Sequence, residues 1–167
     1  MNYSGIYRAD CMNGTGFRVV LFVSGCSHGC HGCQNKQTWN PKTGMVFTDH
    51  VKSDILDALK PNHINGLTLS GGDPLHQRNF NTILQLAKTV KRELPGKTIW
   101  LYTGYTLEQV KADLNLCQIL PYIDVMVDGR FEKELLDKTL KFRGSKNQRL
   151  IDIPQTLQLG EVVTFHD

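Results

Sequence analysis

Continuous apolar segments that end in a glycine turn alternate with amphipathic segments along most of this chain of 167 residues. The segment FRVVLFVSG, residues 17–25, is apolar without alternation, which is typical of a strand covered on both faces in a parallel sheet. Three similar segments occupy residues 64–74, 97–105 and 122–131. Strands separated by helical segments predict an α/β fold with a mostly parallel sheet and right-handed crossovers.

The helical segments carry their own boundary signals. Residues 48–60 and 80–94 place apolar side chains at helical spacing. Thr48 is the expected N-cap of the first helix, and Pro61 ends it. Thr106 with Gln109 has the spacing of a capping box, so a further helix is expected there. The residues after about 142 are less regular, and EVVTF, residues 161–165, is a candidate for a late edge strand.

Size and composition favour one folded domain over residues 1–167. The chain is 40% hydrophobic and 21% charged, which is close to the average for globular proteins. Its 19 Lys and Arg against 16 Asp and Glu form no basic run of the kind that binds nucleic acid. No segment approaches the roughly 18 consecutive apolar residues that a membrane span needs. We therefore expect a cytoplasmic protein with no nucleic-acid or membrane partner.

The segment SGCSHGCHGCQN, residues 24–35, follows the first predicted strand and holds Cys26, Cys30 and Cys33. The chain has five cysteines, an odd number, and three so close together do not resemble a disulfide framework. Reduced thiolates are the better interpretation. Cys11 and Cys117 stand alone, and an isolated cysteine is usually a small buried hydrophobic residue.

Three thiolates without an obvious fourth leave two metal chemistries open. A structural zinc site closes its tetrahedron with a fourth ligand, for which His28, His31 or His50 would serve, so a non-catalytic zinc-binding module is one hypothesis. A [4Fe–4S] cluster held by only three cysteines keeps one iron free for a substrate or cofactor. The glycines of this loop let it wrap tightly around such a cluster.

The predicted strands end in polar, glycine-bearing turns, and in a parallel sheet these ends share one edge. After the cysteine loop come SGGDP (70–74), YTGY (102–105) and DGRFE (128–132). Ligands of such sheets bind at this edge, so we expect the functional site there. As bare strings, these turns are also compatible with a purely structural role.

The motifs together resemble a known family. C-x3-C-x2-C after the first strand is the signature of radical S-adenosylmethionine (SAM) enzymes, and the chain is most similar to the subgroup of glycyl-radical-enzyme activases. The segments that carry the resemblance are NGTGFR (13–18), FVSGCSHGCHGCQNKQTW (22–39), LSGGDPL (69–75), YTGY (102–105), DVMVDGRF (124–131) and RGSKNQR (143–149). They span residues 1 to about 150, whereas the tail, residues 151–167, carries none of the pattern.

The resemblance implies an abridged, open radical-SAM (β/α) partial barrel. At about 30 residues per β–α unit, the chain can hold only some five or six units, which leaves the barrel open on one side. An opening of this kind suits a substrate that is a loop on another protein.

The resemblance also implies the chemistry. In the family, a [4Fe–4S] cluster bound by the three cysteines of the motif, here Cys26, Cys30 and Cys33, reductively cleaves SAM. The products are methionine and a 5′-deoxyadenosyl radical, which takes a hydrogen atom from a glycine of the partner. The implied partner is the large subunit of an anaerobic ribonucleoside-triphosphate reductase, with a flavodoxin-type reductant. A different glycyl radical enzyme, of the pyruvate formate-lyase type, is the alternative target.

By similarity, six residues are expected to contact SAM: Gly32, Cys33, Gln34, Gly71, Gly72 and Asp73. The SGGDP turn would contact the amino group of the cofactor, because glycine lets carbonyl oxygens approach an ammonium group closely. The position before the third cysteine, aromatic in much of the superfamily, is Gly32 here, so backbone contacts are expected from this loop. Asp128 is a candidate for binding the ribose or a partner, and Arg143 and Arg149 are candidates for partner docking.

Overall fold

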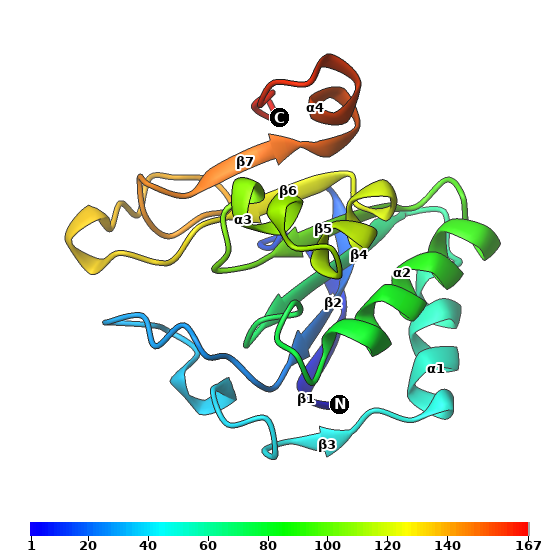
Figure 1. The fold of residues 1–167 in the computed structure, drawn as a ribbon. Coiled ribbons are helices and arrows are strands. Elements are labelled where there is room, and N and C mark those ends of the chain that lie inside the picture. The colour runs from blue at the N-terminus through cyan, green and yellow to red at the C-terminus, as the bar shows by residue number, and fades with distance from the viewer. Residues whose placement is uncertain (167) are drawn as a thin grey trace.

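The computed structural model describes residues 1–166, and its strands form one sheet in the order β3-β1-β2-β4-β5-β6-β7 (Figure 1). The strands are β1 (Asn2–Asp10), β2 (Phe17–Val23), β3 (Met45–Val46), β4 (Ile64–Gly71), β5 (Thr98–Tyr102), β6 (Val125–Asp128) and β7 (Arg149–Asp152). The centre, β2-β4-β5-β6, is parallel, and the pairs toward both edges are antiparallel. The sheet does not close, which confirms the predicted open α/β architecture.

Three crossovers connect the parallel strands. They contain α1 (Asp49–Leu59), α2 (Phe80–Glu93), and α3 (Leu107–Ala112) followed by the 3-10 helix η2 (Leu116–Tyr122). The chain therefore has fewer β–α units than the five or six that its length could hold. The other residues form the long segment between β2 and α1 and the antiparallel strands toward the edges of the sheet. The remaining helices are α4 (Ile153–Leu159) and the short 3-10 helices η1 (Lys36–Thr38) and η3 (Lys133–Leu135).

The predicted helix starts are confirmed by their caps. The hydroxyl of Thr48 accepts a hydrogen bond from the backbone N–H of Val51 at the start of α1. Thr106 and Gln109 form the complete capping box of α3, each side chain accepting from the other residue's backbone N–H. These bonds satisfy donors that a helix start leaves free, so local sequence was sufficient to place both starts.

The two faces of the sheet are packed differently. Helices α1 and α2 lie side by side on one face (Figure 1), where their apolar side chains and those of β2, β4 and β5 form the main core. A smaller cluster on Trp100, Val125, Val127 and Leu150 covers part of the other face. Buried Arg18 also lies here, with its guanidinium over the ring of Trp100. The functional site occupies the strand ends on this second face.

Three strands, β1, β3 and β7, were not predicted, and one predicted strand is reduced to a bridge. β1 mixes exposed and buried residues without a clear period, and β7 is only four residues long. The edge strand expected at residues 161–165 is shortened to a bridge, in which the backbone N–H of Asp152 donates to Val163 and that of Phe165 donates to Leu150. Thr164 makes a single bridge to Ile151, and β7 pairs with β6 in the position expected of an edge strand. Cys117 packs against the core as expected of an isolated cysteine, whereas Cys11 is exposed.

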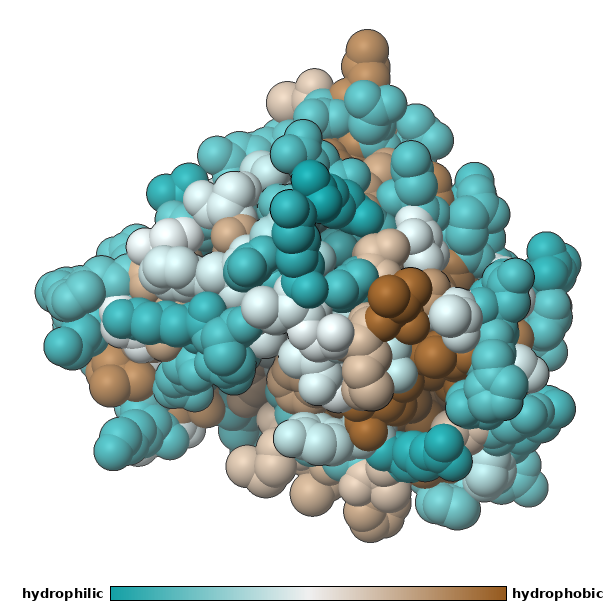
Figure 2. Space-filling model, turned by 90° about the horizontal axis from the view of Figure 1, so that it is seen from below, coloured by the Kyte–Doolittle hydropathy of each residue, from teal (hydrophilic) through white to brown (hydrophobic). Residues whose placement is uncertain are grey.

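None of the helices in residues 1–166 has both the length and the apolar character needed to cross a bilayer. Figure 2 shows the molecule from the side of β3 and the N-terminus: most of this face is hydrophilic, with one area where hydrophobic residues gather.

Candidate functional site

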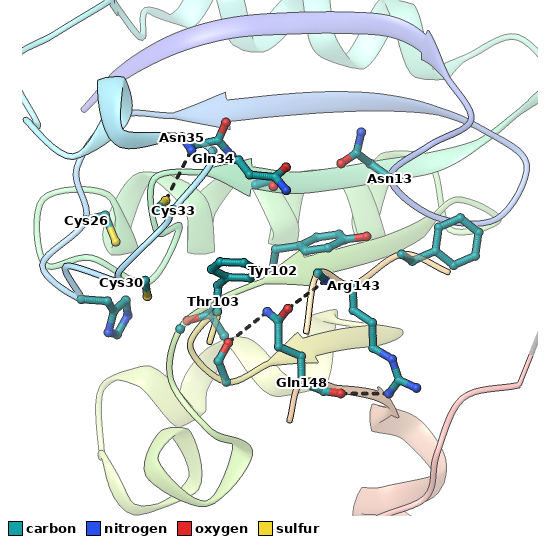
Figure 3. A pocket seen from close by; sticks show the side chains of 18 of the residues that line it. Asn13, Cys26, Cys30, Cys33, Gln34, Asn35, Tyr102, Thr103, Arg143 and Gln148 are labelled. Carbon is teal, nitrogen blue, oxygen red and sulfur yellow. Dashed lines mark hydrogen bonds between the residues drawn. The ribbon is translucent and has the colours of Figure 1, made fainter. Parts of the chain in front are cut away.

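A pocket of about 530 Å³ lies at the carboxyl ends of the parallel strands. The predicted site residues that line it are Cys26, Cys30, Cys33, Gln34, Gly71 and Gly72. Gly32 and Asp73 are not among the residues that line it. Figure 3 shows the three cysteines gathered at one end of the pocket, with Asn13 and Arg143 at the other. The fold thus brings the cysteine loop and the SGGDP turn to one site, as the strand-end argument predicted.

Backbone hydrogen bonds join the cysteine loop to the SGGDP turn. The N–H of Gly72 donates to the carbonyl of Val23 at 2.8 Å, and that of Asp73 donates to Gly25 at 2.7 Å. These bonds continue the pairing of β2 and β4 beyond the strands. A Cβ at Gly72 would lie 2.5 Å from the carbonyl oxygen of Gly25. A glycine is required here because the two backbones are in direct contact.

Asp73 is buried beneath this turn, with 1% of its surface exposed. Its carboxylate accepts hydrogen bonds from the Thr103 hydroxyl at 3.0 Å, from the backbone N–H of Gly104 at 3.1 Å and from that of Leu75 at 2.8 Å. The Nε2 of His28 lies 2.5 Å from Oδ2 of the same carboxylate. The side chain of Asp73 therefore joins the SGGDP turn, the YTGY turn and the cysteine loop. Its expected contact with a cofactor stays a prediction.

His28 is a site residue whose role sequence reasoning missed. Its side chain is only 5% exposed, and its ring packs edge-on against Tyr105 with the centroids 4.7 Å apart. Its partner Asp73 is 45 residues away, so no local pattern could have revealed the contact. His31, two residues before Cys33, differs: its side chain is 75% exposed and lies 3.9 Å from Glu134.

The thiols differ in their electrostatic surroundings. Burial raises the pKa of the Cys26 thiol to about 11, and the charges of Asp73, Cys30 and Cys33 act in the same direction. The backbone N–H of His28 opposes this shift. The backbone N–H of Asn35 donates to the Cys33 sulfur at 3.4 Å. The Cys26 thiol is thus protonated near neutral pH unless a bound cationic group displaces its proton. The binding of metals by thiolates is generally coupled to the release of protons in this way.

The three thiols of the cysteine loop are soft ligands of the kind that iron–sulfur clusters use. Within the described part of the chain, no group of three or more His, Cys, Asp or Glu side chains is gathered closely enough to hold one metal ion. The three cysteines instead lie around one end of a roomy pocket, which fits a polynuclear group bound by soft thiolates.

The rest of the pocket combines aromatic and apolar side chains with polar ones, among them Asn13, Thr103 and Gln148. Tyr102 lies in the middle of the view in Figure 3, and its buried hydroxyl has no hydrogen-bond partner among the described residues. Burial raises the pKa of this hydroxyl. An apolar wall comes from Phe131, Leu136, Leu140 and Phe142. This wall was missed, because residues 131–142 carry no regular apolar period.

Three other candidates from the sequence take different positions. The carboxylate of Asp128 is buried and accepts from the backbone N–H of Leu107 and from Arg149, which also pairs with Glu108. These contacts give Asp128 and Arg149 a structural role. Arg143 lines the pocket, and its Nη1 donates to the carbonyl of Gln148 at 2.8 Å (Figure 3).

Comparison with known proteins identifies the family. Residues 12–151 match the model of a family described as a 4Fe-4S single cluster domain. The chain is 51% identical over 150 residues to a protein of Pasteurella multocida, an alignment that covers 89% of this chain and 95% of the relative. It is 48% identical over 150 residues to proteins of Haemophilus influenzae (89% and 96% covered) and Enterobacteria phage T4 (90% and 93%). Each relative is named an anaerobic ribonucleoside-triphosphate reductase-activating protein.

The chain belongs to this family of activating proteins. Membership confirms the resemblance on which the sequence interpretation was built, and it supports an iron–sulfur cluster in this activating-protein fold. The matched residues, 12–151, include the three cysteines of the loop and every strand-end turn that contributes to the pocket.

Proposed function

We propose that the chain is an activase that binds a [4Fe–4S] cluster through Cys26, Cys30 and Cys33 and uses it to cleave SAM reductively. Its product is a glycyl radical on the large subunit of an anaerobic ribonucleoside-triphosphate reductase. The observation that carries the proposal is the position of the three thiols around one end of a pocket whose wall continues into Gly71 and Gly72. The names of the similar proteins support the choice of reductase over other glycyl radical enzymes.

The chain's own residues have separate roles in this proposal. Cys26, Cys30 and Cys33 would hold the cluster, which when bound would supply the electron for cleavage of a carbon–sulfur bond of SAM. Gly71 and Gly72 line the pocket and would offer backbone groups to the amino group of SAM. The backbone of Gly32, Cys33 and Gln34 would contact the cofactor from the other side. Asp73 would act by holding the turn.

The far wall of the pocket would receive the substrate glycine. Four apolar side chains from residues 131–142 line it beside Asp137 and Lys138, and a docked loop would cover them and shield a reactive radical from side reactions. Because the sheet is open, a loop of the large subunit of the reductase has a route to this wall. The proposed electron donor is a flavodoxin-type protein, and the proposed compartment is the cytoplasm, where thiols stay reduced.

Anaerobic reconstitution tests this function directly. The protein is loaded with iron and sulfide, reduced with dithionite and assayed for 5′-deoxyadenosine in the presence of SAM. We expect about four irons per chain and formation of 5′-deoxyadenosine. A chain with a full, reducible cluster that makes no 5′-deoxyadenosine contradicts the proposal.

Single cysteine variants supply the matched controls. Cys26→Ala, Cys30→Ala and Cys33→Ala should each lose both the cluster and the cleavage of SAM, because each removes one of three ligands. Cys11→Ala and Cys117→Ala should keep both. Incubation of the loaded protein with the large subunit of the reductase, followed by electron paramagnetic resonance, should then show a glycyl radical on the partner.

A further inference from the structure

The segment from Ser27 to Gln34 carries two of the three cysteines and has few polar ties to the rest of the protein. The start of the loop is fixed, because the backbone N–H groups of Gly25 and Cys26 donate to the carbonyls of Thr38 and Trp39. Beyond this point, among the residues that the structure describes, the side chains of 27–34 make two polar contacts with other segments. One is the exposed pair of His31 and Glu134 at 3.9 Å, and the other is the buried pair of His28 and Asp73.

The slot that holds His28 is formed by two strand-end turns. Asp73 of the SGGDP turn receives Nε2 at 2.5 Å, and Tyr105 of the YTGY turn packs against the ring. Gly104 completes the slot: a Cβ at this position would lie 2.4 Å from Cδ2 of His28. The glycine of YTGY is therefore needed to make room for an imidazole that comes from the cysteine loop.

These contacts distinguish His28 from an ordinary loop residue. Its Nε2 is engaged by the carboxylate, which is itself almost fully buried, and the side-chain exposures of the two partners are 5% and 2%. A hydrogen bond to a buried charged group contributes more to stability than one on the surface, and removing its donor leaves the carboxylate incompletely satisfied.

We infer that His28 is a positioning residue that fixes the cysteine loop against the SGGDP and YTGY turns and thereby sets the cluster at the correct place relative to the SAM-binding turn. The inference rests on the proposed function, because it concerns the cluster held by the same loop. His28 acts through Asp73: the carboxylate that receives Nε2 also accepts from Thr103 and from the N–H of Gly104, so one buried group aligns all three segments.

The first test compares three variants in the reconstituted holoenzyme. His28→Phe keeps a ring in the slot and removes the donor to Asp73, His28→Gln retains an amide N–H of similar reach, and His31→Phe changes an exposed histidine of the same loop. We measure the rate at which a chelator removes iron, the midpoint potential of the cluster, and the SAM concentration that half-saturates the change in the electron paramagnetic resonance spectrum.

His28→Phe should lose iron roughly tenfold faster, and its spectrum should require roughly tenfold more SAM, as expected when a hydrogen bond to a buried charge is lost. Its midpoint potential should also differ from that of wild type. His28→Gln should restore most of the wild-type iron retention and SAM response, and His31→Phe should behave as wild type. A wild-type protein that holds no cluster overturns the proposed function together with this inference. A wild-type protein that responds to SAM, with His28→Phe indistinguishable from it, overturns this inference alone.

The second test keeps the inference falsifiable if His28→Phe folds poorly. Gly104→Ala should displace the imidazole while leaving Asp73 intact, and it should speed iron loss several-fold in the wild-type background. In the His28→Ala background the slot has room for the added methyl group, so Gly104→Ala should add little to iron loss or to the change in melting temperature. If Gly104→Ala changes iron loss and melting temperature equally in both backgrounds, the proposed contact is contradicted. A clearly smaller change in the His28→Ala background supports it.

Discussion

The guanidinium of Arg149 donates to both oxygens of the buried Asp128 carboxylate, with Nε 3.0 Å from Oδ1. Asp128 is 1% exposed, and its other hydrogen bond comes from the backbone N–H of Leu107. Arg149→Met should therefore lower the free energy of unfolding by about 3–5 kcal/mol, because it leaves a buried carboxylate without its cation. Urea unfolding of the purified protein measures this.

The exposed pair of Arg92 and Glu93 is the matched control for that change. Its two side chains are 70% and 47% exposed, with 2.8 Å between Nη2 and Oε1. Arg92→Met should cost no more than about 1 kcal/mol. If Arg149→Met and Arg92→Met lower the free energy of unfolding by similar amounts, the ion pair of Arg149 with Asp128 contributes no more to stability than the exposed pair does.

Glu108 gives this region a pH dependence. Its hydrogen bond from Arg149 is the main reason that the pKa of Glu108 is about 2, below the ordinary 4.5. A lowered pKa contributes stability that is complete above about pH 4.5 and is lost as the pH falls from there through about 2. The Glu108 side chain is 60% exposed, so the contribution is small, about 0.5 kcal/mol. Glu108→Gln should be less stable than wild type at pH 7, with the difference shrinking below pH 4.5. A constant difference from pH 7 to pH 3 contradicts this assignment.

The close approach of Gly72 to Gly25 gives a prediction for cofactor affinity. Gly72→Ala places a Cβ 2.5 Å from the carbonyl oxygen of Gly25, so the turn must move away from the cysteine loop. Weaker binding of SAM, by roughly tenfold or more, is expected with a cluster still present, since a displacement of this kind affects alignment more than ligation. Gly96→Ala is the control, because nothing lies within 4 Å of a Cβ at that position. Titration of the reduced, loaded proteins with SAM measures both.

Arg18 is a buried cation for which the described residues supply no carboxylate partner. It donates to the Thr68 hydroxyl at 2.7 Å, to the Leu67 carbonyl at 2.8 Å and to the carbonyl and hydroxyl of Thr98. Burial lowers the pKa of Arg18 to about 10. Arg18→Lys retains the charge but has too few directed donors for these acceptors, so it should cost about 2–4 kcal/mol. Arg8→Lys, at an exposed position, should leave the unfolding midpoint unchanged.

Periodicity and capping residues predicted the central architecture because their causes are local. Each parallel strand is a short apolar segment that ends near a glycine, and the starts of α1 and α3 are fixed by side chains within three residues. The strands at the edges of the sheet were harder to predict from the sequence. β7 is defined by its pairing with β6, and four residues with mixed burial give no signal on their own.

The residues of the candidate site also fall into two groups, those with a local sequence signal and those defined by contacts between distant segments. The three cysteines and the glycines of SGGDP could be found from spacing, since they sit on neighbouring strand ends. The role of His28 could not, because it depends on a carboxylate 45 residues away and on the missing side chain of Gly104. The apolar wall from residues 131–142 is formed by an irregular segment whose side chains share a surface only after folding.

The backbone bonds from Gly72 to Val23 and from Asp73 to Gly25 extend the β2–β4 ladder into the two loops. The amide protons of Gly72 and Asp73 therefore belong to the sheet, whose central strands open only in large, costly fluctuations. In hydrogen–deuterium exchange, these two amides should be protected even in protein without a cluster. The cofactor side of the pocket would then be in place before iron arrives, and assembly would order only the outer part of the cysteine loop.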